Sequence, residues 1–368
     1  MPATIIGLNH ASAVKKWAKG LGAEVAVEDF FTRFQGTDDN SIIQEKEDLK
    51  TEAGDSLSFD LSLRIRGEGV SGDSRVDNTA ENLRLLSDTV VVDQYRKQVS
   101  GGGKMSRKRT LHDLRTLAKD RLKDWWREFM EQLRFIYLSG ARGVNSNFII
   151  TDPNWSGHAG MEITPPDADH LMYGGVATSK ASLTASDTMS RQTISRAAVK
   201  AEMLQEVNPD CINMQPTMIE GAPHYVMLMS PFQEYDLRNE AGAAGWMEIQ
   251  KAASSSLGAK SPIFRGGMGM IDNVVLHSHR WAIRFNNYGA GANVEAARAL
   301  LLGRQAGIIA YGSANNESKF DWFEEMKDAG NEPVFTAGVI FGFKKTKFGG
   351  KDLGVISVDT AAKNPNAI

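Results

Sequence analysis

The stretch SLSFDLSLRIRGEGV, residues 56–70, alternates apolar and polar side chains from residue 57 to residue 66. A period of two is typical of a β-strand with one apolar face. A Gly- and Asp-rich segment follows, so the strand raises the question of which surface covers that face. The apolar face comprises Leu57, Phe59, Leu61, Leu63 and Ile65, and the polar face and loop tip include Arg64, Arg66 and Arg75.

A second strand-like run, rich in Val, Thr and Tyr, covers residues 84–99. The two runs predict a hairpin, although the intervening residues 67–82 form a connection far longer than the usual two to five residues. A two-stranded ribbon alone in water is only marginally stable. We therefore expect the hairpin to lie on another surface.

Three consecutive glycines, Gly101, Gly102 and Gly103, follow the second run and predict a hinge. A helix is then expected to begin near Ser106 or Thr110 and to continue to Leu138, a rod of about 50 Å. Its apolar residues recur every three or four positions and predict one packed face. They are Leu111, Leu114, Ala118, Leu122, Trp125, Phe129, Leu133 and Ile136.

Beyond this helix the sequence predicts interleaved helices and strands. Helices are expected over residues 188–207 and 293–306. Strands are expected over residues 224–230, 274–279, 334–343 and 354–358. Because no regular βαβ rhythm is present, the pattern favours an α+β fold over a doubly wound parallel sheet.

The composition bounds the class of protein. A chain of 368 residues predicts two or three lobes, and a formal charge of −3 gives no overall attraction to nucleic acid or to an anionic membrane. The single cysteine, Cys211, excludes an intrachain disulfide and is interpreted as a small buried hydrophobe. Because no signal peptide or membrane-spanning segment is evident, we expect a cytoplasmic site of synthesis.

Two segments carry opposite charge. Residues 1–50 read as a loosely folded arm, and residues 1–55 contain 6 Lys and Arg against 10 Asp and Glu, a net charge of −4. Residues 104–134 contain 10 basic and 5 acidic side chains, a net charge of +5. A charged helix usually presents a solvated face. The alternative is that arm and helix meet, within one subunit or between two.

Signals for catalysis are weak. His277 and His279 could share one face of a strand as metal ligands, but no third ligand is evident nearby and packing is the simpler interpretation. Glycine-rich residues 265–270 and 287–298 could approach a phosphate, but neither completes a phosphate-loop or dinucleotide motif. A metal- or phosphate-dependent enzyme is kept as the alternative hypothesis, and no cofactor is predicted.

Seven segments together resemble a known family. GDSLSFDLSLRIRGEGV, MSRKRTLHDLR, FIYLSGARG, DADHLMYGG, SPFQEYDLR, GMIDNVVLHSHR and GAGANVEAARALLLGRQAG are similar, in this order, to major capsid proteins of tailed bacteriophages related to the N-four type of podophage. The resemblance covers residues 5–362.

The resemblance implies the coat-protein fold that tailed phages share with herpesviruses. By this analogy residues 1–50 are the N-terminal arm, 51–103 the extended hairpin loop with its glycine hinge, and 104–139 the spine helix of the peripheral domain. Residues 140–330 would form the axial domain with some peripheral strands, 331–362 the returning peripheral strands, and 363–368 a tail.

The implied function is self-assembly into hexamers and pentamers of an icosahedral head around double-stranded DNA. The implied partners are further copies of the chain, scaffolding, portal and decoration proteins, and packaged DNA contacted without sequence specificity. Arm and loop would bind neighbouring subunits, so the apolar face of residues 57–65 would rest on the next copy. A tail or adhesin protein is a third hypothesis, which predicts fibres or trimers instead of closed shells.

Overall fold

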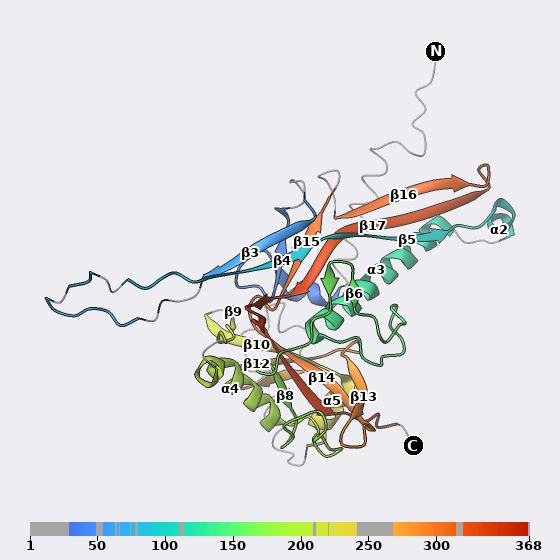
Figure 1. Ribbon diagram of the computed structural model, residues 1–368. Helices are drawn as coiled ribbons and strands as arrows, with labels where there is room; N and C mark the ends of the chain where they lie inside the picture. The colour runs from blue at the N-terminus through green and yellow to red at the C-terminus, as the bar shows by residue number, and fades with distance from the viewer. Residues whose placement is uncertain are drawn as a thin grey trace.

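The computed structural model describes residues 29–48, 54–62, 65, 67–73, 75–77, 80–109, 114–208, 211–219, 221–240, 268–313 and 319–366. Two β-sheets, one above the other in Figure 1, form a six-stranded lobe and an eight-stranded lobe. The long helix α3 (Leu114–Ser139) contributes to the core of both. Helices and strands alternate irregularly, and the predicted α+β class is confirmed.

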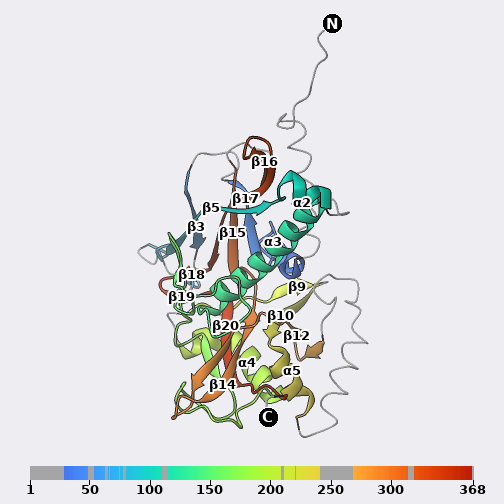
Figure 2. The same cartoon turned by 90° about the vertical axis from the view of Figure 1, so that its right-hand side faces the viewer.

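The six-stranded lobe is organised around β17 (Glu332–Lys345), which pairs antiparallel with three strands. Its first part lies between β16 (Phe320–Lys327) and β5 (Asp93–Ser100), and its last residues pair with β15 (Gly307–Gly312). Figure 2 shows α3 running alongside this sheet when the molecule is turned. The sheet is completed by β1 (Gln35–Gly36) and β2 (Ile43–Lys46).

The eight-stranded lobe is centred on β14 (Val294–Leu302). This strand lies antiparallel between β10 (Ala222–Met229) and β20 (Val355–Ala361), and its first residues also pair with β13 (Arg284–Tyr288). The other strands are β8 (Leu171–Tyr173), β9 (Thr217–Ile219), β11 (Gly269–Ile271) and β12 (Val274–Ser278).

Three small ribbons lie outside the two main sheets. They are β3 (Ser56–Ser62) with β4 (Leu85–Val91), β6 (Gly157–His158) with β7 (Met161–Glu162), and β18 (Lys347–Phe348) with β19 (Lys351–Asp352). The other helices are the 3-10 helix η1 (Phe30–Phe34), α2 (Lys104–Arg109), α4 (Arg191–Val207) and α5 (Pro231–Arg238).

Local sequence signals explain the ends of the helices. The Ser190 side chain accepts a hydrogen bond from the Thr193 N–H at the start of α4, and Ser230 and Gln233 form a capping box at the start of α5. Helix α3 ends at Gly140, which has a φ of 67° and donates its N–H to the Ile136 carbonyl. No helix in the described part of the chain is long and apolar enough to cross a bilayer.

Several predicted elements are confirmed and three are corrected. The helix over residues 188–207 is α4, and the four predicted strands correspond to β10, β12, β17 and β20. The predicted helix over residues 293–306 is wrong, because these residues form β14 and the turn after it. Ala, Leu and Arg favour a helix locally, but from Ala296 onward β14 is buried between paired strands, and tertiary packing overrides that propensity.

The run over residues 84–99 is two strands, not one. β4 pairs with β3 and makes the predicted hairpin, whereas β5 leaves it and joins β17. Of the helix predicted from residue 106 onward, α2 and α3 are helical as expected. Residues 110–113, including Leu111, lie outside the described residues, so the continuity of the helix stays a prediction.

The reading of residues 1–50 as a loose arm is wrong for residues 29–48. Phe31, Phe34, Ile42 and Ile43 in this segment are at most 2% exposed and belong to the main hydrophobic core. The segment shows no sustained periodicity because it forms a single 3-10 turn and two very short strands. Residues 1–28 lie outside the described residues.

Candidate assembly surfaces

The extended loop is a highly exposed feature of the described residues. β3 and β4 pair from Ser56 with Val91 to Ser62 with Leu85, and the loop beyond them projects away from the body in Figure 1. Every described residue from 65 to 84, including Arg75, is exposed. Leu63, Arg64 and Arg66 lie outside the described residues. The large exposed apolar side chains here are Ile65, Val70, Val76, Leu83 and Leu85.

The base of the loop packs on its own subunit, contrary to the sequence interpretation. Leu57 and Phe59 contact a small core that includes Val90 and Ile308, and the Phe59 ring meets the Phe348 ring edge-on at 5.8 Å. The alternation predicted the face correctly but not what covers it. Among the described residues of the loop, the distal apolar side chains stay exposed in the subunit.

The glycine segment is closely packed in the subunit. The Gly101 N–H donates to the Pro333 carbonyl at 2.7 Å, and a Cβ at Gly101 would lie 2.9 Å from atoms of the Pro333 and Phe335 side chains. Gly102 has a φ of 70°, which disfavours other residues, and the Lys104 N–H donates to the Asn331 side chain. These contacts give the glycines a packing role, and the hinge stays a prediction.

Helix α3 packs through the predicted stripe. Its first turns bury one face, whereas its last turns are buried on every side because both lobes close around them. At the neighbouring tryptophans, Trp126 is fully buried and Trp125 is partly buried, stacked on Phe129 at 4.8 Å. Of the predicted stripe, Ala118, Leu122, Phe129, Leu133 and Ile136 are buried, and Leu114 is partly exposed.

The N-terminal segment and α3 meet within one subunit. Asp29 and Arg134 form an ion pair, and both side chains are at most 5% exposed. The Glu131 carboxylate accepts the Phe30 N–H at 3.0 Å, and burial is the main reason that its pKa is raised. The described residues therefore favour the contact within a subunit over a fully solvated helix.

The two histidines of the metal hypothesis are packed among aromatic rings. His277 meets Phe34 edge-on at 5.3 Å, and His279 stacks on Phe135 at 5.0 Å. Burial lowers the pKa of His279 to about 4, and the neighbouring cations act in the same direction, so its imidazole is neutral at pH 7. Among the described residues, no group of three or more His, Cys, Asp or Glu could hold a metal ion.

The second glycine-rich stretch does not lead into a helix. Residues 287–298 comprise the end of β13, the turn of residues 289–293 and the start of β14, with Gly289 at a φ of 81°. The helix expected over residues 293–306 would have offered its N-terminus to a phosphate. A strand follows this described turn instead, so the turn has no helix N-terminus that could bind a phosphate. Of residues 265–270, only 268–270 are described, and they lead into β11.

A buried ion pair joins α3 to the eight-stranded sheet, and the sequence analysis did not identify it. Arg298 on β14 donates to both carboxylate oxygens of Asp359 on β20, at 2.6 and 2.7 Å. It also donates to the Ser139 carbonyl at 2.7 Å, at the end of α3, and Tyr288 donates to Asp359 at 2.7 Å. A single Arg within the apolar run of residues 296–302 was the one signal in the sequence for a buried ion pair. Its partner could not be predicted from that run, because Asp359 lies 61 residues away.

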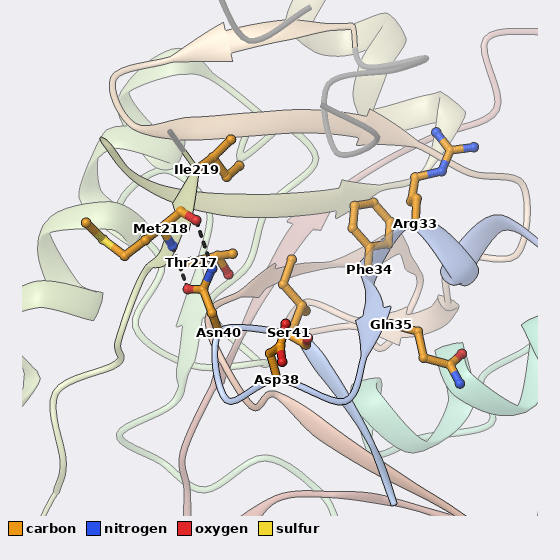
Figure 3. A pocket seen from close by; sticks show the side chains of 10 residues that line it. Arg33, Phe34, Gln35, Asp38, Asn40, Ser41, Thr217, Met218 and Ile219 are labelled. Carbon is orange, nitrogen blue, oxygen red and sulfur yellow. Dashed lines mark hydrogen bonds between the residues drawn. The ribbon is translucent and has the colours of Figure 1, made fainter. Parts of the chain in front are cut away.

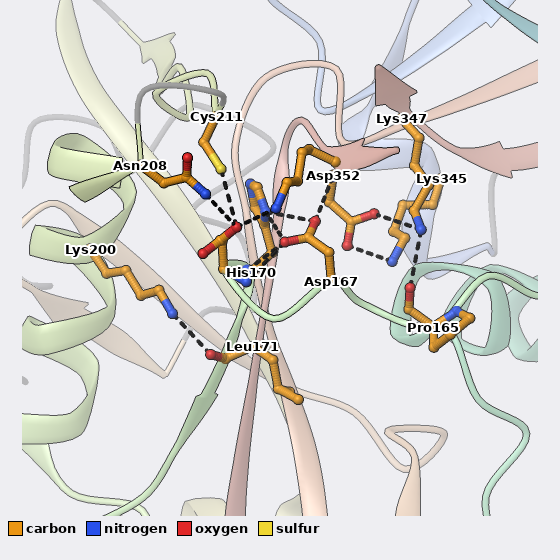
Figure 4. Close-up of polar contacts among 12 residues, drawn as sticks. Pro165, Asp167, His170, Leu171, Lys200, Asn208, Cys211, Lys345, Lys347 and Asp352 are labelled. Atoms are coloured by element: carbon orange, nitrogen blue, oxygen red, sulfur yellow. Dashed lines mark hydrogen bonds and ion pairs between the residues drawn. The ribbon is translucent and has the colours of Figure 1, made fainter. Parts of the chain in front are cut away.

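A second polar network surrounds the β18–β19 ribbon (Figure 4). Asp167 interacts with the His170 ring and accepts the Asp352 N–H at 2.8 Å. Burial alone would raise the pKa of Asp167, but these hydrogen bonds outweigh it and hold the pKa well below its usual range. Burial raises the pKa of the Cys211 thiol to about 11, so this thiol is unreactive at pH 7.

A pocket of about 320 Å³ lies where the β1–β2 loop meets β9 (Figure 3). The Asn40 side chain makes two hydrogen bonds of 2.8 Å there, one to the Met218 carbonyl and one from the Met218 N–H. These bonds cover part of the edge of β9. The pocket thus belongs to the junction that ties the N-terminal segment to the eight-stranded lobe.

Comparison with known proteins places these surfaces in context. Residues 5–364 match the phage capsid protein family. The chain is 26% identical to the major capsid protein of Pseudomonas phage KPP25 over 361 residues, which cover 90% of this chain and 91% of that protein. The capsid of Ralstonia phage GP4 is 51% identical, with a TM-score of 0.88 and full coverage of both chains. The cyanophage Pam1 capsid shares the fold at 21% identity, with a TM-score of 0.69 and coverage of 90% and 92%.

Proposed function

Since this chain belongs to the phage capsid protein family and is a major capsid protein of a tailed-phage head, we propose that its extended loop holds neighbouring copies together in the shell. The single observation that carries the proposal is the exposure of the distal loop. Ile65, Val76 and Leu83 are 61%, 70% and 68% exposed, which is unusual for apolar side chains gathered on one segment.

Burial of these side chains on the next copy would supply free energy of association, because they are exposed in the single subunit. Each would contribute on the order of 1–2 kcal/mol before the cost of ordering the loop. A lattice repeats the contact at every subunit, so a weak contact becomes strong in the closed shell.

Charged side chains on the loop can take part in the same arrangement. Residues 64–84 carry four carboxylates, Glu68, Asp73, Asp77 and Glu81, balanced by four arginines, Arg64, Arg66, Arg75 and Arg84. At the far end of the six-stranded lobe in Figure 1, α2 carries four basic residues among its six. The loop carboxylates of one copy can meet the basic helix of the next, with interactions that salt weakens.

The wider assignment follows the family. The six-stranded lobe would be the peripheral domain and the eight-stranded lobe the axial domain, gathered around hexamer and pentamer axes of the virion capsid. The boundaries expected from the sequence, 1–50, 51–103, 104–139, 140–330, 331–362 and 363–368, stay proposals. Assembly would take place in the cytoplasm of the bacterial host, with scaffolding, portal and decoration proteins as partners.

Contact with packaged double-stranded DNA would be weak and independent of sequence, because the net charge of the chain is −3. The segment Gly101–Gly103 would change angle during expansion of an immature shell, which requires its contacts with Asn331 and Pro333 to open. If the triple replacement by Ala still allowed normal expansion, the hinge would be excluded. Residues 67–82 contain no lysine, so no covalent ladder through a loop lysine is expected on a denaturing gel.

Electron microscopy of the expressed chain, alone and with its neighbouring gene products, tests the proposal. Wild type should form shells or tubes, whereas the triple variant Ile65→Asp, Val76→Asp and Leu83→Asp should remain unassembled with an unchanged Tm. Ser71→Asp adds charge at an exposed polar position of the same loop and should assemble normally. Shells formed by the triple variant would contradict the role of the loop.

A further inference from the structure

A second row of exposed apolar side chains lies on the eight-stranded lobe. Val199, Met203 and Val207 are spaced four residues apart on α4, so they share one helix face, and they are 60%, 49% and 83% exposed. Val176, 93% exposed, lies in the adjoining loop, where the Gly175 carbonyl accepts a hydrogen bond from α4. We call Val176, Val199, Met203 and Val207 the α4 stripe.

The subunit does not need the α4 stripe for its own core. The opposite face of α4 packs on the sheet through Ile194, Ala197 and Ala201, which are fully buried. The stripe exposes on the order of 300 Å² of apolar surface, comparable to the largest patch on a typical monomer. That is well below the roughly 800 Å² per partner of a stable complex, so a single contact would not hold a dimer together.

A pocket of about 300 Å³ opens elsewhere on the same lobe, beside β13 and the C-terminal segment. Val144, 42% exposed, and Phe285 give it an apolar wall, and the pocket has room for a valine or methionine side chain. Figure 1 shows α4 and β13 on opposite sides of the eight-stranded lobe. We call this hollow the β13 pocket; its lining comprises Val144, Arg284, Phe285, Asn286, Glu295, Ala296, Ala362 and Asn364.

The charges around the two surfaces are complementary. Exposed Arg196 lies toward the Val176 end of the stripe, and exposed Glu202 and Glu206 lie toward the Val207 end. The β13 pocket presents both signs, with Arg284 and Glu295 in its wall. Charged groups at each end of the stripe can therefore pair with groups of opposite sign in the pocket wall.

We propose that the α4 stripe of one copy packs into the β13 pocket of the next copy, head to tail around a ring. This inference rests on the proposed function, because it requires copies of the chain to lie side by side. Two different surfaces on opposite sides of one lobe make a heterologous contact, which does not stop at a dimer and forms a ring where the rotation between copies closes. Each copy then makes the contact twice, which compensates for its small area.

Crosslinking of assembled particles tests the contact. In the double variant Met203→Cys with Val144→Cys, treatment with a bis-maleimide should give trimers and larger species on a denaturing gel. Neither single variant should give a ladder, and the native Cys211 is only 1% exposed, so wild type should give none. The matched control pairs Met203→Cys with Leu117→Cys, which is also 42% exposed but lies on α3, and should give no ladder.

Intact particles of the double variant without a ladder would overturn this inference alone. Dimers from the single variant Met203→Cys would also overturn it, because they would show α4 facing α4 across a twofold axis. Absence of particles from wild type would contradict the proposed function, and the inference with it.

A second variant gives an independent measurement. Val199→Asp with Met203→Asp should lower the yield of particles about tenfold with no change in the Tm of the subunit, since both side chains are exposed. Gln192→Asp, an exposed polar position on the same helix, should assemble as wild type does. A normal yield from the double variant would overturn the proposed contact.

Discussion

Removal of the Asp359 carboxylate should destabilise the subunit more than most single changes. In Asp359→Ala, the Arg298 guanidinium loses two charge-assisted hydrogen bonds while the residue remains 6% exposed, and the Tyr288 hydroxyl loses its acceptor. An uncompensated buried charge of this kind costs about 3–5 kcal/mol. In wild type burial lowers the pKa of Arg298 and Asp359 raises it. Without Asp359 the lowering by burial is no longer outweighed, but a guanidinium has an ordinary pKa above about 12 and keeps its proton at pH 7, so loss of the proton does not relieve the cost.

Urea unfolding of the unassembled subunit, followed by circular dichroism, measures this change. With a slope of about 3 kcal/mol per molar urea, the midpoint should fall by roughly 1 M or more. The matched control is the double variant Arg298→Met with Asp359→Leu, which removes both charges and should recover most of the lost free energy of unfolding. A single variant within 1 kcal/mol of wild type would refute the reasoning, as would a double variant no more stable than the single one.

Three further changes test other parts of the structure. Asp167→Asn should lower stability at pH 7. The difference from wild type should begin to shrink as pH falls below the ordinary carboxyl pKa of about 3.9 and should vanish only below the depressed pKa of Asp167, because the stabilising effect of the carboxylate is lost between these two values. A difference independent of pH would contradict this. Gly101→Ala should lower the Tm, because its new Cβ would be too close to neighbouring atoms, at a cost of about 1–3 kcal/mol in the free energy of unfolding. Gly69→Ala is the control, since a Cβ there would have nothing within 4 Å, and its Tm should be unchanged. Equal Tm values for the two variants would exclude the packing role. Phe31→Ala should lower the free energy of unfolding, measured in urea, by about 3–5 kcal/mol, because Phe31 is fully buried. The control Phe323→Ala, at a 53% exposed position, should change it little. A small effect of Phe31→Ala would mean that residues 29–48 do not hold the core together.

Local patterns in the sequence were sufficient for much of the fold. The alternation of residues 56–62 predicted which side of β3 is apolar, and the spacing of Leu122, Phe129, Leu133 and Ile136 predicted the packed face of α3. These signals are reliable because the direction of a side chain follows from the local backbone period alone. The resemblance to phage capsid proteins rested on whole segments in order, and the comparisons confirm it.

The sequence by itself therefore determined many of the elements and the family, whereas the tertiary structure decided what each element packs against and which elements override their local propensity. Residues 294–302 have helix-forming side chains but become a central strand because neighbouring strands bury them on both sides. Leu57 and Phe59 rest on their own subunit, and Arg298 finds Asp359 across the sheet. Such partners lie far away in sequence, and the free energy of burial and of ion pairing depends on them, so no local period can specify them.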